Sequence, residues 1–437
     1  MIAKKNRFHI ETFGCQMNVN DSEKVAGLLL ADGYERAGSV RDADFVFINT
    51  CAVREKAAEK LYHAVGRLRR LKRERPALRI GVGGCVAQLE GREVLERAPG
   101  VDLLVGTHNL SRVPELLREA HARPAVELDK AADAFNVPHE TVAHSSPVRA
   151  FVSVMEGCNH VCSFCVVPRT RGTEVCRPVE AIVAEVRSLV DRGYPEVMLL
   201  GQTINAYRDG RTDFVGLLEE VQSVPGLRRL RFTTSHPSHV DARFARALRD
   251  LPRLCPYLHL PFQSGSDRVL ADMRRGYTAA GYRGIAAMLR DHVPRLALTA
   301  DIIVGYPCEE AADFQATAEL VEQVGFDGLF VFLYSPRPGT GALRLGDPVP
   351  EAEKKRRFQI LNVHQQRRQE RLNAARVGTT EEVLVDAVER DGLSGRTRDF
   401  RIVHFEGPPS WLGRTVVVEI EGSGPNSLRA RVRETTH

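Results

Sequence analysis

The chain has 437 residues and an ordinary globular composition, with 43% hydrophobic residues, 27% charged residues, 35 glycines and 23 prolines. This composition excludes a fibrous or collagen-like protein and a wholly disordered chain, and the length predicts about three domains. The formal net charge of +5 is too small to indicate a nucleic-acid partner by itself. No stretch approaches the ~18 apolar residues of a membrane span, and no apolar signal-peptide core follows the first residues, so we expect a cytoplasmic protein with no membrane association.

Short apolar runs alternate with helical patterns over the first hundred residues. This alternation favours a parallel sheet covered by helices, which we expect to be doubly wound. The predicted strands are 8–13, 44–49, 79–83 and 101–105, and the predicted helices are 21–30, 54–74 and 93–97. Residues 122–149 then contain three prolines and no sustained period, which indicates an irregular connection.

The alternation resumes after this connection and repeats about six times. Six βα units over roughly 200 residues favour a partial (β/α)6 barrel over an open sheet, with its chemistry at the carboxyl ends of the strands. The predicted strands are 151–155, 197–200, 230–233, 257–260, 298–304 and 329–333, with helical patterns such as 179–192 and 311–323 between them. Beyond residue 377, four short β-rich runs predict a small closed barrel. These runs are 382–388, 401–405, 415–420 and 428–432.

The nine cysteines are an odd number and are unevenly placed, and a reducing cytoplasm argues against disulfides. Cys158, Cys162 and Cys165 lie within eight residues, after the first strand of the predicted (β/α)6 barrel. Thiolates are the ligands of iron–sulfur clusters, and three of them leave one iron of a four-iron cluster open. The alternatives are a zinc site with His160 as the fourth ligand, and three thiols that are simply buried. Zinc is not favoured, because the sequence offers no second pair of ligands. Three others, Cys176, Cys255 and Cys308, fit incidental packed thiols.

Three more cysteines share one local context although they are far apart in the sequence. Cys15, Cys51 and Cys85 each directly follow a predicted strand. Parallel strands place such positions at one edge of a sheet, so we expect the three thiols to meet and hold a second cluster. Any one of them alone fits a small packed residue. Glycines beside them suit a backbone that approaches a bulky cofactor.

The motifs together resemble the radical S-adenosylmethionine (SAM) methylthiotransferase family, and the resemblance extends over essentially the whole chain. The run Gln16-Met17-Asn18 after the first cysteine favours the branch of that family that modifies tRNA. The segments that carry the resemblance are 11–18, 49–56, 157–168, 170–172, 200–202, 235–237, 259–261, 263–266, 301–305 and 334–340. By this resemblance, the domains are a methylthiotransferase amino-terminal domain (6–122), a linker (123–143), a radical SAM core (144–375) and a TRAM domain (376–437).

The resemblance implies one reaction, the attachment of a methylthio group to carbon 2 of N6-isopentenyladenosine next to the tRNA anticodon. Two [4Fe-4S] clusters and SAM are the implied cofactors, and no catalytic residue is implied beyond the cluster ligands. That carbon is unactivated, so a cofactor-derived radical must remove its hydrogen. The open iron at Cys158, Cys162 and Cys165 would bind SAM, and the cluster at Cys15, Cys51 and Cys85 would carry the sulfur. The alternatives are the same chemistry on a ribosomal-protein aspartate, and a non-catalytic iron–sulfur carrier or RNA-binding protein that has lost its chemistry.

The remaining expectations concern contacts and partners. We expect Gly201, Gln202, Ser235 and Asp301 to help line the SAM pocket, with core packing at a strand end as the alternative. Basic candidates for tRNA contact are 66–75, the helix 351–376 with eight Lys/Arg against three Glu, and the last domain, although such runs are commonly solvated helix faces. The first candidates for phosphate contacts are Arg396, Arg398 and Arg401. The family also implies a monomer and an electron donor such as flavodoxin or ferredoxin.

Overall fold

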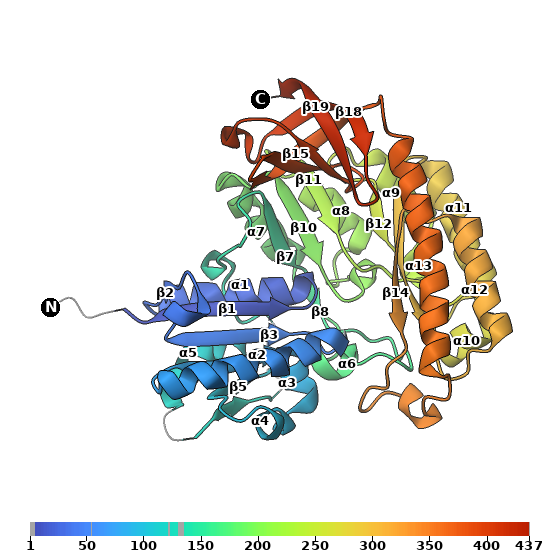
Figure 1. Ribbon diagram of the computed structural model, residues 1–437. Coiled ribbons are helices and arrows are strands. Elements are labelled where there is room, and N and C mark those ends of the chain that lie inside the picture. Colours follow the sequence, from blue (N-terminus) through green and yellow to red (C-terminus); the bar gives the residue numbers. More distant parts are fainter. Residues whose placement is uncertain (1–4, 54, 121–122, 130–134, 437) are drawn as a thin grey trace. The chain divides into compact units, whose positions relative to one another are not determined.

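The computed structural model (Figure 1) describes residues 5–53, 55–120, 123–129 and 135–436. The chain divides into two units. The amino-terminal unit comprises Met1–Ser145, Met155–Val161 and Cys165–Arg177, and the carboxyl-terminal unit comprises the rest. Among the described residues, no helix has the length and apolar character needed to cross a membrane.

The amino-terminal unit contains a six-stranded, fully parallel sheet in the order β2-β1-β3-β4-β5-β6. Its strands are β1 (Arg7–Phe13), β2 (Glu35–Arg36), β3 (Phe45–Thr50), β4 (Arg79–Gly84), β5 (Leu103–Val105) and β6 (Ala125–Glu127). The predicted parallel sheet is therefore confirmed. The short edge strands β2 and β6 were not predicted, and β6 lies inside the segment expected to be an irregular connection.

Helices cover both faces of this sheet. On one face, α1 (Gln16–Ala31) and α5 (Val113–Glu119) enclose an apolar core with the phenylalanines of β3. On the other face, α2 (Glu55–Glu74), α3 (Cys85–Glu90) and α4 (Glu93–Arg97) enclose a second core. Helices on both faces of a sheet bury its central strands, and all six residues of β3 are buried. The doubly wound arrangement is confirmed.

The carboxyl-terminal unit contains all six predicted strands of the partial barrel, as two three-stranded parallel sheets ordered β11-β10-β7 and β12-β13-β14. The strands are β7 (Arg149–Ser153), β10 (Glu196–Leu200), β11 (Arg229–Phe232), β12 (Tyr257–His259), β13 (Ala297–Val304) and β14 (Gly328–Leu333). The helices are α7 (Val179–Asp191), α8 (Phe214–Gln222), α9 (Ala242–Asp250), α10 (Asp267–Asp272), α11 (Ala279–His292), α12 (Ala311–Val324) and α13 (Glu351–Ala374).

A closed five-stranded barrel in the order β15-β16-β17-β19-β18 completes this unit. Its strands are β15 (Thr380–Glu389), β16 (Gly392–Thr397), β17 (Ile402–Phe405), β18 (Thr415–Ser423) and β19 (Ser427–Thr436). The predicted small barrel is confirmed, with β16 as an additional strand. Arg229 and Arg231 of β11 donate hydrogen bonds to the backbone oxygens of Arg396 (2.6 Å) and Thr397 (2.9 Å), so this barrel is attached directly to the parallel strands.

A buried ion-pair network stands at this attachment. Glu196 of β10 is fully buried between the guanidinium groups of Arg231 and Arg149, and the Arg231 pair measures 2.8 Å. Burial opposes ionisation of Glu196, but the two guanidinium groups outweigh it and lower the pKa of the carboxyl to about 2. Phe400 covers the network, with its ring centroid 4.6 Å from the Arg231 guanidinium carbon. The network therefore holds β7, β10 and the small barrel together.

This depressed pKa makes a prediction about acid stability. Glu196 contributes stabilisation above its unfolded pKa of about 4.5, and this is lost as the pH falls from there towards 2. The shift corresponds to roughly 3 kcal/mol. Anaerobic guanidinium unfolding at pH 7 should give Glu196→Gln a lower free energy of unfolding than the natural chain. Between pH 7 and pH 3, this free energy should fall less in Glu196→Gln than in the natural chain. The exposed Glu219→Gln is the control, and an unchanged acid dependence in Glu196→Gln would refute the assignment.

Candidate functional site

The carboxyl ends of β1, β3 and β4 lie in register within the amino-terminal unit. Phe13 pairs with Thr50, and Thr50 pairs with Gly84. A cysteine follows each of these three strands within two residues. These cysteines are Cys15, Cys51 and Cys85. The common register places them at one edge of the sheet, as the sequence predicts.

The three thiols interact with one another. A hydrogen bond from Cys51, aided by the charge of Arg171, lowers the pKa of the Cys15 thiol to about 6 in spite of its burial. The same bond to Cys15, together with burial and the nearby Cys85, raises the pKa of Cys51. Burial likewise raises the pKa of Cys85, against the attraction of Arg171. The structure thus brings the three predicted residues together as one group of soft ligands.

The backbone around these thiols leaves little room for side chains. A Cβ on Gly14 would lie 2.9 Å from the Cys51 Cβ. Gly84 has a φ of +90°, and a Cβ there would lie 2.2 Å from Asn49 Oδ1. Asn49 in turn donates to the backbone oxygen of Asn18 at 2.8 Å. Glycine at these positions lets the strand ends approach the thiols closely.

Arg171 is a charged residue of this site that sequence analysis does not single out, although segment 170–172 carries part of the family resemblance. Its guanidinium is 3% exposed and pairs with Asp21 at 2.5 Å and with Glu156 at 3.1 Å. Asp21 lies on α1, the helix that follows Cys15, while Glu156 lies two residues before Cys158. Arg171 therefore connects the strand-end thiols to the segment that begins the second cysteine motif.

The second cysteine motif follows β8 (Met155–Glu156). In the amino-terminal unit, the backbone N–H of Cys158 donates to the Gly172 oxygen at 3.2 Å, and the Cys165 sulfur accepts from the Val167 N–H at 3.4 Å. In the carboxyl-terminal unit, the Cys162 sulfur accepts a hydrogen bond of 3.3 Å from Arg275 Nη1. Hydrogen bonds to sulfur are typical of thiolates that ligate iron–sulfur clusters, so the donors fit the predicted group.

Two of the predicted SAM contacts carry buried polar atoms that have no partner among the described residues. Gln202 follows the end of β10, and both atoms of its side-chain amide are buried and unbonded. Ser235 follows β11, and its hydroxyl is likewise buried and unbonded. Thr234, directly before it, is held at a φ of 63°. Unpaired buried polar groups and a strained backbone are typical of sites that bind a ligand. The neighbouring Gly201 is buried and leaves the backbone beside Gln202 free of a side chain.

Asp301 differs from these residues. It lies inside β13 rather than at its carboxyl end, and its carboxylate is 3.4 Å from Nε2 of His259 on the adjacent strand β12. Across the sheet, Asp301 pairs with Phe330 of β14, a side chain that is 50% exposed. The SAM role of Asp301 stays a prediction.

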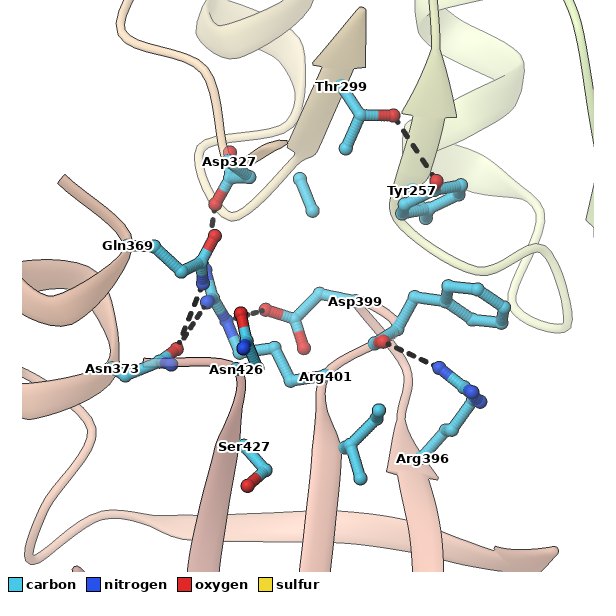
Figure 2. A pocket seen from close by; sticks show the side chains of 13 residues that line it. Tyr257, Thr299, Asp327, Gln369, Asn373, Arg396, Asp399, Arg401, Asn426 and Ser427 are labelled. Carbon is cyan, nitrogen blue, oxygen red and sulfur yellow. Dashed lines mark hydrogen bonds and ion pairs between the residues drawn. The ribbon is translucent and has the colours of Figure 1, made fainter. Parts of the chain in front are cut away.

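The arginines predicted to contact phosphate lie near the amino ends of the parallel strands, whereas Gln202 and Ser235 follow the carboxyl ends of these strands. Arg396 and Arg401 help to line a cavity of about 210 Å³. Tyr257 of β12 and Asp327, just before β14, line the same cavity (Figure 2). Arg401 is 8% exposed and pairs with Asp327 at 2.8 Å. Arg398 donates to the backbone oxygen of Pro252 at 2.6 Å. These side chains serve internal contacts, and their role in tRNA binding stays a prediction.

Three family models match the chain in succession. Residues 7–106 match "Uncharacterized protein family UPF0004", residues 152–321 match the "Radical SAM superfamily", and residues 374–432 match the "TRAM domain". The predicted domain limits, which these matches do not test, stay a prediction.

The chain is also similar to curated proteins over nearly its full length. It is 46% identical to the tRNA-2-methylthio-N(6)-dimethylallyladenosine synthase of Bordetella petrii, covering 99% of this chain and 92% of that protein. The identically named protein of Chromobacterium violaceum is 46% identical, with 97% of each chain covered.

Solved structures share the fold at low identity. The radical SAM methyltransferase TsrM from Kitasatospora setae has a TM-score of 0.56 and 14% identity, covering 77% of this chain and 75% of that one. The cobalamin-dependent radical SAM enzyme OxsB has a TM-score of 0.53 and 12% identity, covering 80% of this chain and 56% of that one.

The Arg171 network yields a stability prediction. Replacing Arg171 with Met leaves the carboxylates of Asp21 and Glu156 buried without their partner, which should cost about 3–5 kcal/mol in the free energy of unfolding. Arg171→Lys should recover part of this loss, because lysine keeps the charge and loses the forked contacts. Arg118→Met removes the exposed pair with Asp32 and should cost under ~1 kcal/mol. Anaerobic guanidinium unfolding measures all three, and an Arg171→Met loss no larger than that of Arg118→Met contradicts the prediction.

Proposed function

Because the chain belongs to the family of the tRNA-2-methylthio-N(6)-dimethylallyladenosine synthases, we propose that it attaches a methylthio group to carbon 2 of N6-isopentenyladenosine in tRNA. The observation that carries this proposal is the gathering of Cys15, Cys51 and Cys85 at one sheet edge, in addition to the cysteine motif that starts at Cys158. A radical enzyme with one cluster needs only the second set. The names of the relatives favour tRNA over the ribosomal-protein alternative.

The cofactors are two [4Fe-4S] clusters and SAM, and the donor sets fit them. Cys15, Cys51 and Cys85 would hold one cluster, and a second group of thiols would hold the other. This second group is Cys158, Cys162 and Cys165. When bound, these groups supply the electron that cleaves SAM, the radical that removes the carbon-2 hydrogen, and the sulfur that replaces it.

The side chains at the strand ends bind and orient SAM. The amide of Gln202 and the hydroxyl of Ser235, which have no partner in the described part of the chain, offer donors and acceptors to the polar groups of SAM. Gly201 allows close approach to the backbone. These contacts satisfy groups that otherwise carry a desolvation penalty. Arg171 retains its charge beside the strand-end thiols and offsets the negative charge of the group that they bind.

The partners follow from this chemistry. The target base lies next to the anticodon, in a single-stranded loop whose bases are accessible to stacking and hydrogen bonding. Binding of the tRNA phosphates should weaken with added salt. A flavodoxin or ferredoxin would supply electrons, and we propose that the enzyme acts as a monomer in the cytoplasm.

The function is tested with the anaerobically reconstituted protein and tRNA that carries the isopentenyl group. Mass spectrometry of the nucleosides should show the methylthio product with the natural chain. The triple variant Cys15→Ala, Cys51→Ala, Cys85→Ala should still cleave SAM but form no methylthio product, because only the second cysteine set remains. A fully loaded natural chain that leaves isopentenyladenosine unchanged, or that modifies a ribosomal protein instead, would refute the tRNA assignment.

The SAM pocket is tested at Gln202. Gln202→Leu should weaken SAM binding about tenfold, the equivalent of one lost hydrogen bond. The same change should leave the free energy of unfolding equal or higher, because it removes a buried amide that has no partner in the described structure. Equilibrium dialysis with SAM and guanidinium unfolding give the two values. Gln315→Leu, on the exposed face of α12, is the control. Unchanged SAM affinity in Gln202→Leu would exclude Gln202 from the pocket.

A further inference from the structure

Arg275 is a buried arginine with an unusual set of partners. Its side chain lies in the loop after α10, and the residue is 7% exposed. The guanidinium donates to the Cys162 sulfur at 3.3 Å, to the Pro261 backbone oxygen at 3.1 Å and to the Tyr277 hydroxyl at 2.9 Å. Within the described residues, no carboxylate forms an ion pair with it. Its one anionic partner is therefore the Cys162 thiol, once that thiol has lost its proton.

The other deeply buried arginines of the chain are compensated by carboxylates. Arg171 pairs with Asp21, Arg231 with Glu196, and Arg357 with Glu309. Arg229 pairs with the partly exposed Glu382 at 2.9 Å. Burying a cation without an anion is costly, and each of these arginines avoids that cost locally. At Arg275, a thiolate that ligates a cluster would supply the missing negative charge.

The backbone holds Arg275 in this place. Arg274 before it has a φ of +56°, and Gly276 after it has a φ of +72°. A left-handed conformation at a non-glycine residue such as Arg274 is strained and is kept only where the surroundings require it. The aromatic ring of Tyr277 lies 5.4 Å from the Arg275 guanidinium carbon.

Cys162 is held from the other side by its neighbour in the sequence. Ser163 donates its backbone N–H to the backbone oxygen of Met273 at 3.2 Å and its hydroxyl to the backbone oxygen of Asp272 at 2.9 Å. The Ser163 and Tyr306 hydroxyls are 2.8 Å apart. The end of α10 therefore fixes both the thiol and the guanidinium that donates to it.

We propose that Arg275 is a positioning residue that sets the reduction potential of the cluster ligated by Cys162. A cation and an N–H donor at a ligand sulfur stabilise the reduced, more negative state of the cluster, and so raise its potential. Arg275 acts through Cys162 and does not contact SAM or the substrate in this role. The inference rests on the proposed function, since it requires a cluster at Cys158, Cys162 and Cys165.

The test uses the full chain with the strand-end cysteines replaced by Ala, so that one cluster gives the signal. Redox titration with dithionite, followed by electron paramagnetic resonance, gives the reduction potential of the cluster in this parent chain and in its variants Arg275→Met and Arg275→Lys. At the potential that half-reduces the parent cluster, the reduced-to-oxidised ratio in Arg275→Met should fall about tenfold, equivalent to about 59 mV for one electron. Arg275→Lys should recover much of the ratio, and the exposed Arg283→Met should leave it unchanged.

A second measurement keeps the inference testable if Arg275→Met loads poorly. In a chain with Cys158, Cys162 and Cys165 replaced by Ala, Arg275 has lost its anionic partner, so Arg275→Met should increase the stability to guanidinium. An equal potential in Arg275→Met and the parent, or a destabilisation by Arg275→Met in this background, overturns the role of Arg275. A parent that forms no cluster at all would instead refute the proposed function.

Discussion

The register of three parallel strands brings the thiols of Cys15, Cys51 and Cys85 to one edge of the sheet. Phe13, Thr50 and Gly84 are aligned across β1, β3 and β4, so residues that follow these strands must meet at one edge. A shift of one pairing would move a thiol out of this group and turn buried side chains to the other face of the sheet. The three thiols are therefore brought together without a local sequence motif. The strand register that aligns them is held by the apolar cores on the two faces of the sheet.

Buried arginines recur through both units, and their partners separate structural from chemical roles. Arg231 and Arg149 enclose Glu196 where the small barrel meets the parallel strands, and this arrangement is complete without any cofactor. Arg171 is matched by two carboxylates and also lies near three thiols. Arg275 has a thiol in place of a carboxylate. Arg231 and Arg149 therefore have a structural role, whereas the charge of Arg275 would be balanced by a thiolate that ligates a cluster.

Much of the fold could be predicted from periodicity, because buried parallel strands are near-continuous apolar runs. Strand β16 was missed because Gly392–Thr397 contains two glycines and no alternation, and it is a strand through pairing with β15 and β17. Arg229 and Arg231 alternate with apolar residues, a pattern that indicates a solvated face. They are buried because backbone oxygens of the small barrel accept their hydrogen bonds. Arg401, whose charge in the sequence suggested a surface role, is buried through a different contact, its ion pair with Asp327. The thiols of the site could be predicted, because the cysteines follow predicted strands. The roles of Arg171 and Arg275 could not, because each depends on partners that are distant in the sequence.

We propose that six thiols form two independent triplets, each of which holds its own four-iron cluster. Iron and sulfide analysis combined with Mössbauer spectroscopy on the anaerobically reconstituted protein distinguishes one cluster from two. We expect about eight irons per chain, and about four after Ala replaces either cysteine triplet alone, with the remaining cluster still of the four-iron type. About four irons in the natural chain, or loss of all iron when Cys15, Cys51 and Cys85 alone are replaced, would contradict it.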